Sequence, residues 1–248
     1  MLISCSTMDA WLFTPTPVTP TETPPPTATI NWFPATATST LQTFPTKAPT
    51  AEMRPGLGNI LLSDDFSDPS LWDTAVSNQA SAGVDNNRLT LAVQSGVYML
   101  SLRQDLALNN FYAEITARPS LCRSDDNYGV LIRATTATYY RFALACNGTV
   151  RAERISSGNR VPLQQPLQSG DVPPGAPGEV RIGIWAVGRE MRLFLNGRFQ
   201  FSVSDPTFRS GTIGVFVRSA GDTAAVVSFS DLSIQGIDYI PPTNTPVP

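Results

Sequence analysis

The sequence predicts an all-β fold, a sandwich of two antiparallel sheets of jelly-roll type, preceded by a disordered segment rich in proline and threonine. Short runs rich in β-branched and aromatic residues follow one another from Gly58 onwards, separated by turn residues at intervals of about eight to twelve positions. No segment shows helical periodicity, and residues 6–58 show no periodicity of either kind. About twelve strands without helices are typical of a two-sheet jelly roll.

Residues 6–58 form one compositional block of proline, threonine and alanine, as in TPTPVTPTETPPPT. Proline fixes φ and lacks an amide proton, and the residue before it is driven out of the helical region. We therefore expect a disordered linker of extended conformers, about 3 Å per residue, with a composition typical of O-glycosylated stalks. Residues 238–248 return to this composition, so the folded domain is expected over 59–237.

Two tight turns are specific within that domain. Asn147-Gly148 and Asn196-Gly197 each separate two runs of alternating polarity. Asn-Gly is the strongest short hairpin signal, because both central residues of the turn take positive φ. Each pair therefore predicts a β-hairpin.

Composition excludes several classes of chemistry. The chain of 248 residues has no histidine, which removes the Ser-His-Asp and Cys-His systems and every zinc site containing histidine. Three cysteines are too few for an all-cysteine zinc site. A formal net charge of −3 offers no basic excess for a phosphate backbone, so no nucleic-acid partner is expected.

The order of these signals resembles the concanavalin A-like lectin/glucanase superfamily, the jelly roll shared by legume lectins and laminin G-like modules. The resemblance covers about residues 59–237 and is carried by LLSDDFSDPSLWDT, NNRLTLAV, YGVLIRATTATYYRFALACNGTVRAERI, VRIGIWAVGREMRLFLNGRFQFSV, GTIGVFVRS and VVSFSDLSI. The chain is also similar to bacterial domains of the 3-keto-disaccharide hydrolase-like type. The resemblance implies the fold; lectins, hydrolases and adhesion modules all share it.

The start of the chain is similar to the end of a bacterial lipoprotein signal peptide. In Leu2-Ile3-Ser4-Cys5, Cys5 would become the lipid-bearing residue, although the charged and apolar regions that precede such a cysteine are absent. Either the start was assigned too late or the match is fortuitous. With the stalk that follows, the resemblance implies that residues 1–5 are the remnant of a lipoprotein signal. It also implies an extracytoplasmic, cell-surface protein with a membrane as partner through its lipid anchor.

Alternation along a strand sorts its residues between the two faces of a sheet. The aliphatic and aromatic residues of one parity are expected to face the core. If the central strands share one sheet, the other parity gives its outer face. The candidate ligand-binding residues of that face are Tyr112, Glu114, Arg133, Tyr139, Arg141, Arg181, Trp185 and Phe194.

This composition suits a carbohydrate such as a cell-envelope glycan, and an acidic one in particular. Aromatic rings stack on the apolar faces of sugars, while arginine and glutamate hydrogen-bond hydroxyls or carboxylates. The alternative is structural: opposite charges across strands stabilise sheets by about 0.2–1 kcal/mol, and a loop can cover Trp185.

The carboxylates do not favour hydrolysis. Glycosidases use two carboxylates on either side of the scissile bond, and the Glu-x-Asp-x-x-Glu run of laminarinase-type relatives does not occur here. Glu114 is the one acid placed on the outer face, and Glu153 has no clear partner. We therefore expect a non-catalytic carbohydrate-binding module. A glycan-active hydrolase of the 3-keto-disaccharide hydrolase-like type and a structural or protein-adhesion domain are the alternatives.

No cofactor is expected, with one weak exception. If the first and last strands pair, as is common in jelly rolls, Asp64 and Asp231 are candidates for a structural Ca²⁺. The alternative is that Asp68-Pro69-Ser70 is a turn and Asp231 lies at an edge. Cys122 and Cys146 are expected at the same edge of a meander, where a disulfide would suit an extracytoplasmic protein.

Overall fold

The computed structural model describes residue 22 and residues 52–239. The predicted signal remnant with Cys5, the rest of the predicted linker up to residue 51 and the tail from residue 240 lie outside the described residues. No helix in the described part is long and apolar enough to cross a membrane.

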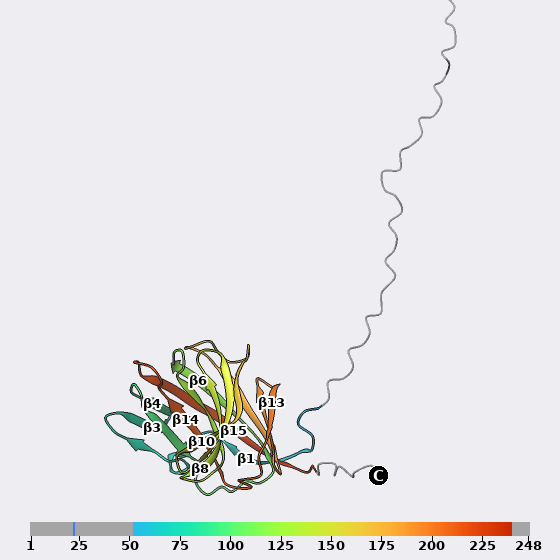
Figure 1. The fold of residues 1–248 in the computed structure, drawn as a ribbon, viewed down its shortest axis with the longest axis horizontal. Helices are drawn as coiled ribbons and strands as arrows, with labels where there is room; N and C mark the ends of the chain where they lie inside the picture. The colour runs from blue at the N-terminus through green and yellow to red at the C-terminus, as the bar shows by residue number, and fades with distance from the viewer. Residues whose placement is uncertain (1–21, 23–51, 240–248) are drawn as a thin grey trace, which may run out of the picture. The chain divides into compact units, whose positions relative to one another are not determined.

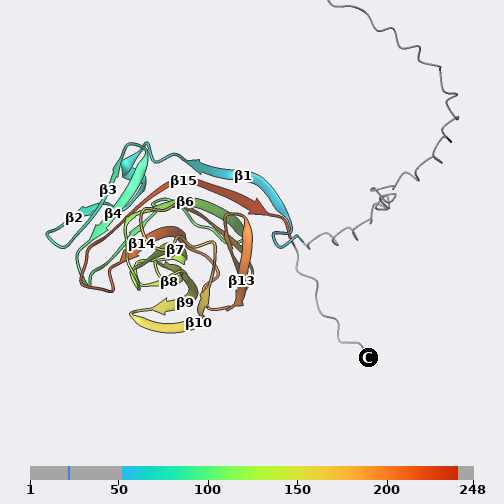
Figure 2. The same ribbon diagram turned by 90° about the horizontal axis from the view of Figure 1, so that it is seen from above.

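The described residues confirm the predicted all-β sandwich of two antiparallel sheets (Figures 1 and 2). One short 3₁₀ helix, η1 (Pro69–Leu71), interrupts the strands. The strands are β1 (Leu57–Asp64), β2 (Ala75–Val76), β3 (Ala80–Asp85), β4 (Arg88–Val93), β5 (Tyr98–Leu102), β6 (Phe111–Leu121), β7 (Asn127–Ala134), β8 (Thr138–Ala145), β9 (Thr149–Ser156), β10 (Asn159–Gln168), β11 (Val180–Val187), β12 (Glu190–Leu195), β13 (Arg198–Ser204), β14 (Thr212–Arg218) and β15 (Ala225–Ile237).

The two sheets differ in size. The large sheet has nine strands in the order β13-β12-β11-β6-β15-β4-β3-β2, with β1 paired to the far half of β15. The small sheet has six strands in the order β10-β9-β8-β7-β14-β5. In Figure 2 the strands β15 and β6 of the large sheet arch over β14, β7 and β8 of the small one.

The core lies between the sheets and is built by the alternation that the sequence predicts. Phe111 and Ile115 of β6 and Phe142 of β8 are buried in one cluster, and Phe142 stacks on Phe201 of β13 with ring centroids 6.2 Å apart. Each such side chain contributes about 1.5–3 kcal/mol of hydrophobic stabilisation. Two smaller clusters of buried residues lie on the outer faces of the sheets, and they decide where a ligand can reach the domain.

Both predicted hairpins form, with different turns. Asn196 and Gly197 both take positive φ, 51° and 77°, as the two-residue turn between β12 and β13 requires. In the turn between β8 and β9 only Gly148 does so, with φ 89°. Asn147 there turns its side chain onto Thr149, whose backbone N–H donates to Asn147 Oδ1 at 3.0 Å.

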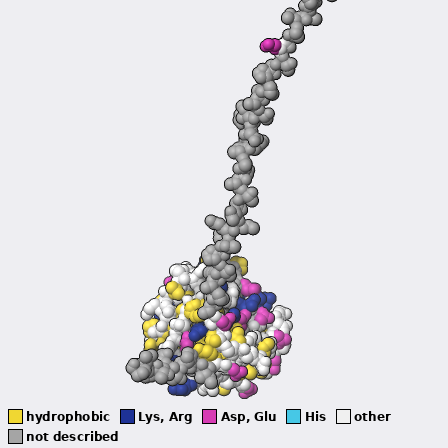
Figure 3. Space-filling view, turned by 90° about the vertical axis from the view of Figure 1, so that its right-hand side faces the viewer, with side chains coloured by type: hydrophobic (Ala, Val, Ile, Leu, Met, Phe, Trp, Pro, Cys, Tyr) yellow, Lys and Arg dark blue, Asp and Glu magenta, His cyan; other side chains and the backbone are white. Residues whose placement is uncertain are grey.

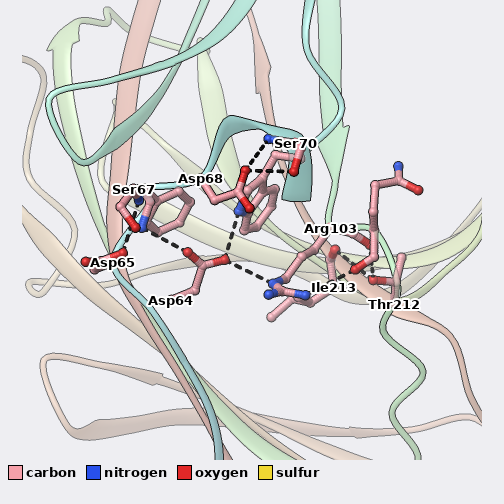
Figure 4. Close-up of polar contacts among 11 residues, drawn as sticks. Asp64, Asp65, Ser67, Asp68, Ser70, Arg103, Thr212 and Ile213 are labelled. Atoms are coloured by element: carbon pink, nitrogen blue, oxygen red, sulfur yellow. Dashed lines mark hydrogen bonds and ion pairs between the residues drawn. The ribbon is translucent and has the colours of Figure 1, made fainter.

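The Asp64 carboxylate accepts hydrogen bonds from three positions along the chain after β1 (Figure 4). It is buried at the end of β1 and accepts from Phe66 N at 2.9 Å, Trp72 Nε1 at 3.1 Å and Arg103 Nε at 3.0 Å. Arg103 in turn donates its backbone N–H to the carbonyl oxygen of Ile213, in β14, at 2.9 Å. One carboxylate thereby links the first strand of the large sheet to the small sheet.

The calcium candidates are not brought together. The first and last strands do pair, with Asp64 opposite Leu232. However, the Asp64 side chain is buried among three donors, whereas the Asp231 side chain is 70% exposed and lies 3.9 Å from Arg118. Asp68 caps η1 by accepting from Ser70 N at 2.9 Å, as the turn alternative requires. Within residues 52–239 no three His, Cys, Asp or Glu side chains are grouped to hold a metal.

The predicted disulfide between Cys122 and Cys146 is present, with Cα atoms 6.0 Å apart. Its setting differs from the expected meander. Cys122 follows β6 of the large sheet and Cys146 follows β8 of the small one, so the bond cross-links the two sheets.

We expect Asp64→Ala to lower the free energy of unfolding by about 3–5 kcal/mol, because it leaves the buried Arg103 guanidinium without its carboxylate. The matched control is Asp231→Asn, which removes an exposed ion pair worth about 0–1 kcal/mol and keeps a residue type that tolerates the positive φ of 57° at this position. Urea unfolding of the two variants measures both values. Equal losses would contradict the assigned role of Asp64.

Replacing both Cys122 and Cys146 with alanine should cost about 3 kcal/mol, because the bond closes a loop with a sequence separation of 24 residues. The loss should match that caused by reducing the native chain. A variant as stable as the oxidised protein would show that the cross-link between the sheets is not a constraint on the unfolded chain.

Candidate functional site

The predicted ligand-binding residues do not share one sheet, so that assumption is wrong. Tyr112, Glu114, Arg181, Trp185 and Phe194 lie on β6, β11 and β12 of the large sheet. Arg133, Tyr139 and Arg141 lie on β7 and β8 of the small sheet. The chain crosses from one sheet to the other between β6 and β7, so the two groups belong to opposite outer faces of the sandwich.

The large-sheet group is covered by the chain segments that flank the domain. Trp185 is fully buried and donates its indole N–H to the carbonyl oxygen of Pro55 at 3.1 Å. The Arg192 guanidinium lies 4.4 Å from the centroid of the Trp185 ring and donates to the Met53 carbonyl at 2.7 Å. Tyr239 packs on the same indole, with ring centroids 5.8 Å apart. The structural alternative, in which another part of the chain covers Trp185, is therefore what the structure shows.

Arg54 closes the neighbouring part of this face. Its guanidinium carbon lies 5.5 Å from the centroid of the Tyr112 ring and 5.4 Å from that of Phe194. The Tyr112 hydroxyl donates to Glu114 at 2.6 Å, and burial together with this hydrogen bond raises the pKa of Tyr112 to about 12. Glu114 also pairs with Arg181 at 3.0 Å. These polar groups have partners within the domain. This part of the outer face of the large sheet is therefore a packing contact with the flanking segments.

The small-sheet group lies in a second outer cluster built on aromatic rings. Tyr98 of β5 reaches across the face so that its hydroxyl lies 3.2 Å from that of Tyr139 on β8. The Arg141 guanidinium lies 5.7 Å from the ring centroid of Tyr98 and 5.4 Å from that of Phe216. Tyr139, Arg141 and Phe216 are buried, whereas Tyr98 is partly exposed, so Tyr98 forms the outer layer of the cluster.

Glu153 is the charged centre of this face. Its side chain is fully buried and shared by three arginines: Arg141 Nε at 2.8 Å, Arg151 Nε at 2.9 Å and Arg160 Nε at 2.7 Å. Burial lowers the pKa of Arg141, but Glu153 and Tyr98 together raise it by more, so the net shift is upward. The partner that the sequence did not reveal for Glu153 is thus a set of cations.

The small sheet is strongly basic as a result. Its six strands contain one carboxylate, Glu153, against six arginines. By the cross-strand register, Arg141, Arg151, Arg160 and Arg218 belong to the outer face. Three positive charges on that face remain after Glu153 is counted.

Figure 3 views a different side of the domain, the one nearest to β13 in Figure 1. Acidic, basic and hydrophobic side chains are interspersed there.

Arg133 does not present its charge on this face as expected. It is buried at the end of β7 with φ 48°, and it donates to the carbonyl oxygens of Phe208 and Asn109, each at 3.0 Å. It ties two loops together at one end of the sandwich.

Sequence reasoning missed Tyr98 and Phe216. The alternation in VYMLSL and GTIGVFVRS places both on the side opposite the core. Alternation identifies the face of the sheet on which Tyr98 and Phe216 lie. Only the strand order β8-β7-β14-β5 brings both residues close to Arg141.

We expect the cover over Trp185 to be removable. A fragment of residues 57–239 should show Trp185 emission shifted to the red and more quenched by acrylamide than a fragment of residues 52–239, because it lacks Met53, Arg54 and Pro55. Both fragments keep Trp72, which is buried and serves as the internal reference. Identical emission and quenching would contradict the assignment of residues 52–56 as the cover.

The sequence matches no family model and no curated protein. In fold the chain is similar to carbohydrate-binding module CBM66 from Bacillus subtilis, at 13% identity and a TM-score of 0.50, over 68% of this chain and 98% of that one. It is similar to a protein of unknown function with a galectin-like fold from Bacillus subtilis, at 12% identity and a TM-score of 0.52, over 73% of this chain and 97% of that one. Xylan β-1,4-xylosidase from Bacillus halodurans C-125 is a third, at 15% identity and a TM-score of 0.52, over 70% of this chain and 38% of that one. At these identities the likeness shows the fold alone, a two-sheet β-sandwich of the galectin-like, jelly-roll type.

Proposed function

We propose that this domain is a non-catalytic carbohydrate-binding module and that the outer face of the small sheet is its binding surface. The observation that carries the proposal is the set of aromatic rings and arginines around Glu153. Tyr98 offers a ring and a hydroxyl. Arg151 and Arg160 keep 14% and 51% of their side chains exposed and share Glu153 with Arg141, which lies 5.7 Å from the Tyr98 ring. Rings that stack on sugars and guanidinium groups that bind oxygens in pairs are what glycan recognition uses.

The charge of this face favours an acidic glycan, such as one of the cell envelope. The surplus of guanidinium over carboxylate attracts a ligand that carries carboxylates or sulfates, and arginine binds such groups through two parallel hydrogen bonds. Tyr139 and Arg141 lie beneath Tyr98 and hold it in place, so they act in the proposal as support rather than as direct contacts.

The number and the pairing of the carboxylates on this face favour binding without hydrolysis. Glycoside hydrolysis uses a pair of them, one of which must exchange a proton with the leaving group. Glu153 is the only carboxylate in the six strands of the small sheet, and three arginines hold it. The similarity in fold to a carbohydrate-binding module and to a xylan β-1,4-xylosidase supports a function on glycans, and the choice of binding over hydrolysis rests on the carboxylates.

The proposal places the module outside the cytoplasm, on a stalk anchored to the membrane through a lipid on Cys5. Two observations support this location. The Cys122–Cys146 bond suits an oxidising compartment, and the proline- and threonine-rich composition of residues 6–58 suits a spacer on a cell surface.

The test is a glycan array of neutral and acidic polysaccharides probed with the full chain. We expect binding to acidic glycans, and Arg151→Gln with Arg160→Gln should weaken it by about tenfold or more, because charge-assisted hydrogen bonds are lost. The matched control is Arg118→Gln with Arg181→Gln. These two arginines of the large sheet each pair with one glutamate, at 2.7 Å and 3.0 Å.

The control variant should bind as the native chain does. Unchanged binding by the Arg151/Arg160 variant would remove the small sheet as the binding surface. Absence of binding to every glycan on the array would overturn the carbohydrate-binding proposal itself.

A further inference from the structure

A groove lies at one end of the sandwich, where the turn between β11 and β12 meets the chain that follows β13. It consists of two adjoining hollows. One of about 570 Å³ is lined by residues 187–190 and 202–204, and one of about 280 Å³ by Gly188, Arg189, Pro206 and Arg209. Gly188 and Arg189 line both hollows, so one ligand can touch both; we call the pair the turn groove. Its size is within the range of small-ligand sites, about 300–1,000 Å³.

The turn groove carries cations without internal partners. Most arginines of residues 52–239 form ion pairs. Arg189 and Arg209 are exposed, and neither pairs with a carboxylate of the described residues. Their guanidinium groups are therefore available to a ligand.

The carboxylates beside the groove are already neutralised. Glu190, which lines it, pairs with Arg192 at 2.8 Å, and Asp205 pairs with Arg154 at 2.6 Å. Each pair contributes no net charge, so the charge of Arg189 and Arg209 stands uncompensated.

A third arginine, Arg133, binds the segment that carries Arg209. Arg133 is buried, and its hydrogen bonds go to the carbonyl oxygens of Phe208 and Asn109 rather than to a carboxylate. Its Nε has no partner among the described residues. Burial lowers the pKa of Arg133, Tyr140 raises it, and repulsion from the charge of Arg209 lowers it. An anion between the loops would relieve that repulsion.

The backbone of the groove is held in place before any ligand arrives. Asp205 N donates to the Arg189 carbonyl oxygen at 2.9 Å, and Gly188 N donates to Asn110 Oδ1 at 2.9 Å. The Tyr140 hydroxyl donates to Asp205 Oδ1 at 2.8 Å and accepts from Phe208 N at 3.0 Å. Such bonds fix the spacing of the two segments that carry Arg189 and Arg209, which reduces the ordering cost of binding.

We propose that the turn groove is a second binding site, for an anionic saccharide unit that carries a carboxylate or a sulfate group. Arg189 and Arg209 bind the anionic group, and the exposed Ser202 and Ser204 provide hydroxyls for the sugar. The site is separate from the outer face of the small sheet and does not depend on the function proposed for that face.

The test uses the full chain, with D-glucuronate and D-glucose 6-sulfate as probes at constant ionic strength and D-glucose as the neutral comparison. Backbone amide resonances of Gly188, Arg189 and Arg209 should shift with a saturable, about millimolar dependence on at least one anion and should not respond to glucose. Arg189→Gln with Arg209→Gln should weaken this response by about tenfold or more.

The matched control is Arg88→Gln with Arg123→Gln, which removes the same charge from two other exposed arginines that form no ion pair with described residues. It should keep the native response. A response to only one of the two anions identifies the group that the site recognises. No response to either anion, an equal response to glucose, or a native response in the Arg189/Arg209 variant would overturn the proposal.

The outcome is separable from that of the glycan array. Loss of array binding in the Arg151/Arg160 variant with an intact response of Gly188 and Arg189 would establish two sites. Loss of the amide response in the Arg189/Arg209 variant with intact array binding would show that the groove binds the anion independently of the surface that binds the arrayed glycans.

Discussion

The pairing of the last strand with the first is the constraint on which the accessible surfaces of the domain depend. It sets Leu57 opposite Ile237, so the segments before β1 and after β15 leave the sheet side by side. Asp238 N donates to the Gly56 carbonyl oxygen at 2.9 Å, and a Cβ at Gly56 would lie 2.7 Å from that of Tyr239. Because the two segments are held this close, they cover Trp185 together and keep a ligand from the part of the large sheet around it.

The two outer faces bury their aromatic rings in different ways. On the large sheet, flanking segments and the guanidinium groups of Arg54 and Arg192 cover the rings. On the small sheet, the cover is Tyr98, a side chain of the sheet itself, above Arg141. A cation over a ring contributes about 0.5–2 kcal/mol, so both arrangements stabilise the fold. The small sheet leaves unbalanced positive charge on the face that carries the partly exposed ring of Tyr98, which is why it carries the proposed function.

Alternation in the sequence predicted the side on which most strand residues lie, because that property is local. Phe142 is in the core and Arg141 is on the outer face, as expected. Membership of a sheet is not local: β6 pairs with β11 and β15, which follow it by more than fifty residues. The sequence therefore could not separate Trp185 from Tyr139 or join Tyr98 to Arg141. The segment that covers Trp185 could not be identified for another reason, since residues 52–56 lie within the predicted linker and their contacts are tertiary.

The cations of the small sheet and of the turn groove are all arginines, which limits how pH can change the charge of these two surfaces. The chain has no histidine, its one lysine is Lys47, and every cation side chain in residues 52–239 is an arginine. Arginine stays protonated throughout the physiological range, so the charge of the small sheet and of the turn groove does not vary with pH near neutrality. Exposed charges are screened within about 10 Å at 0.1 M ionic strength. We therefore expect salt, rather than a change of pH near neutrality, to weaken the proposed binding of an acidic glycan.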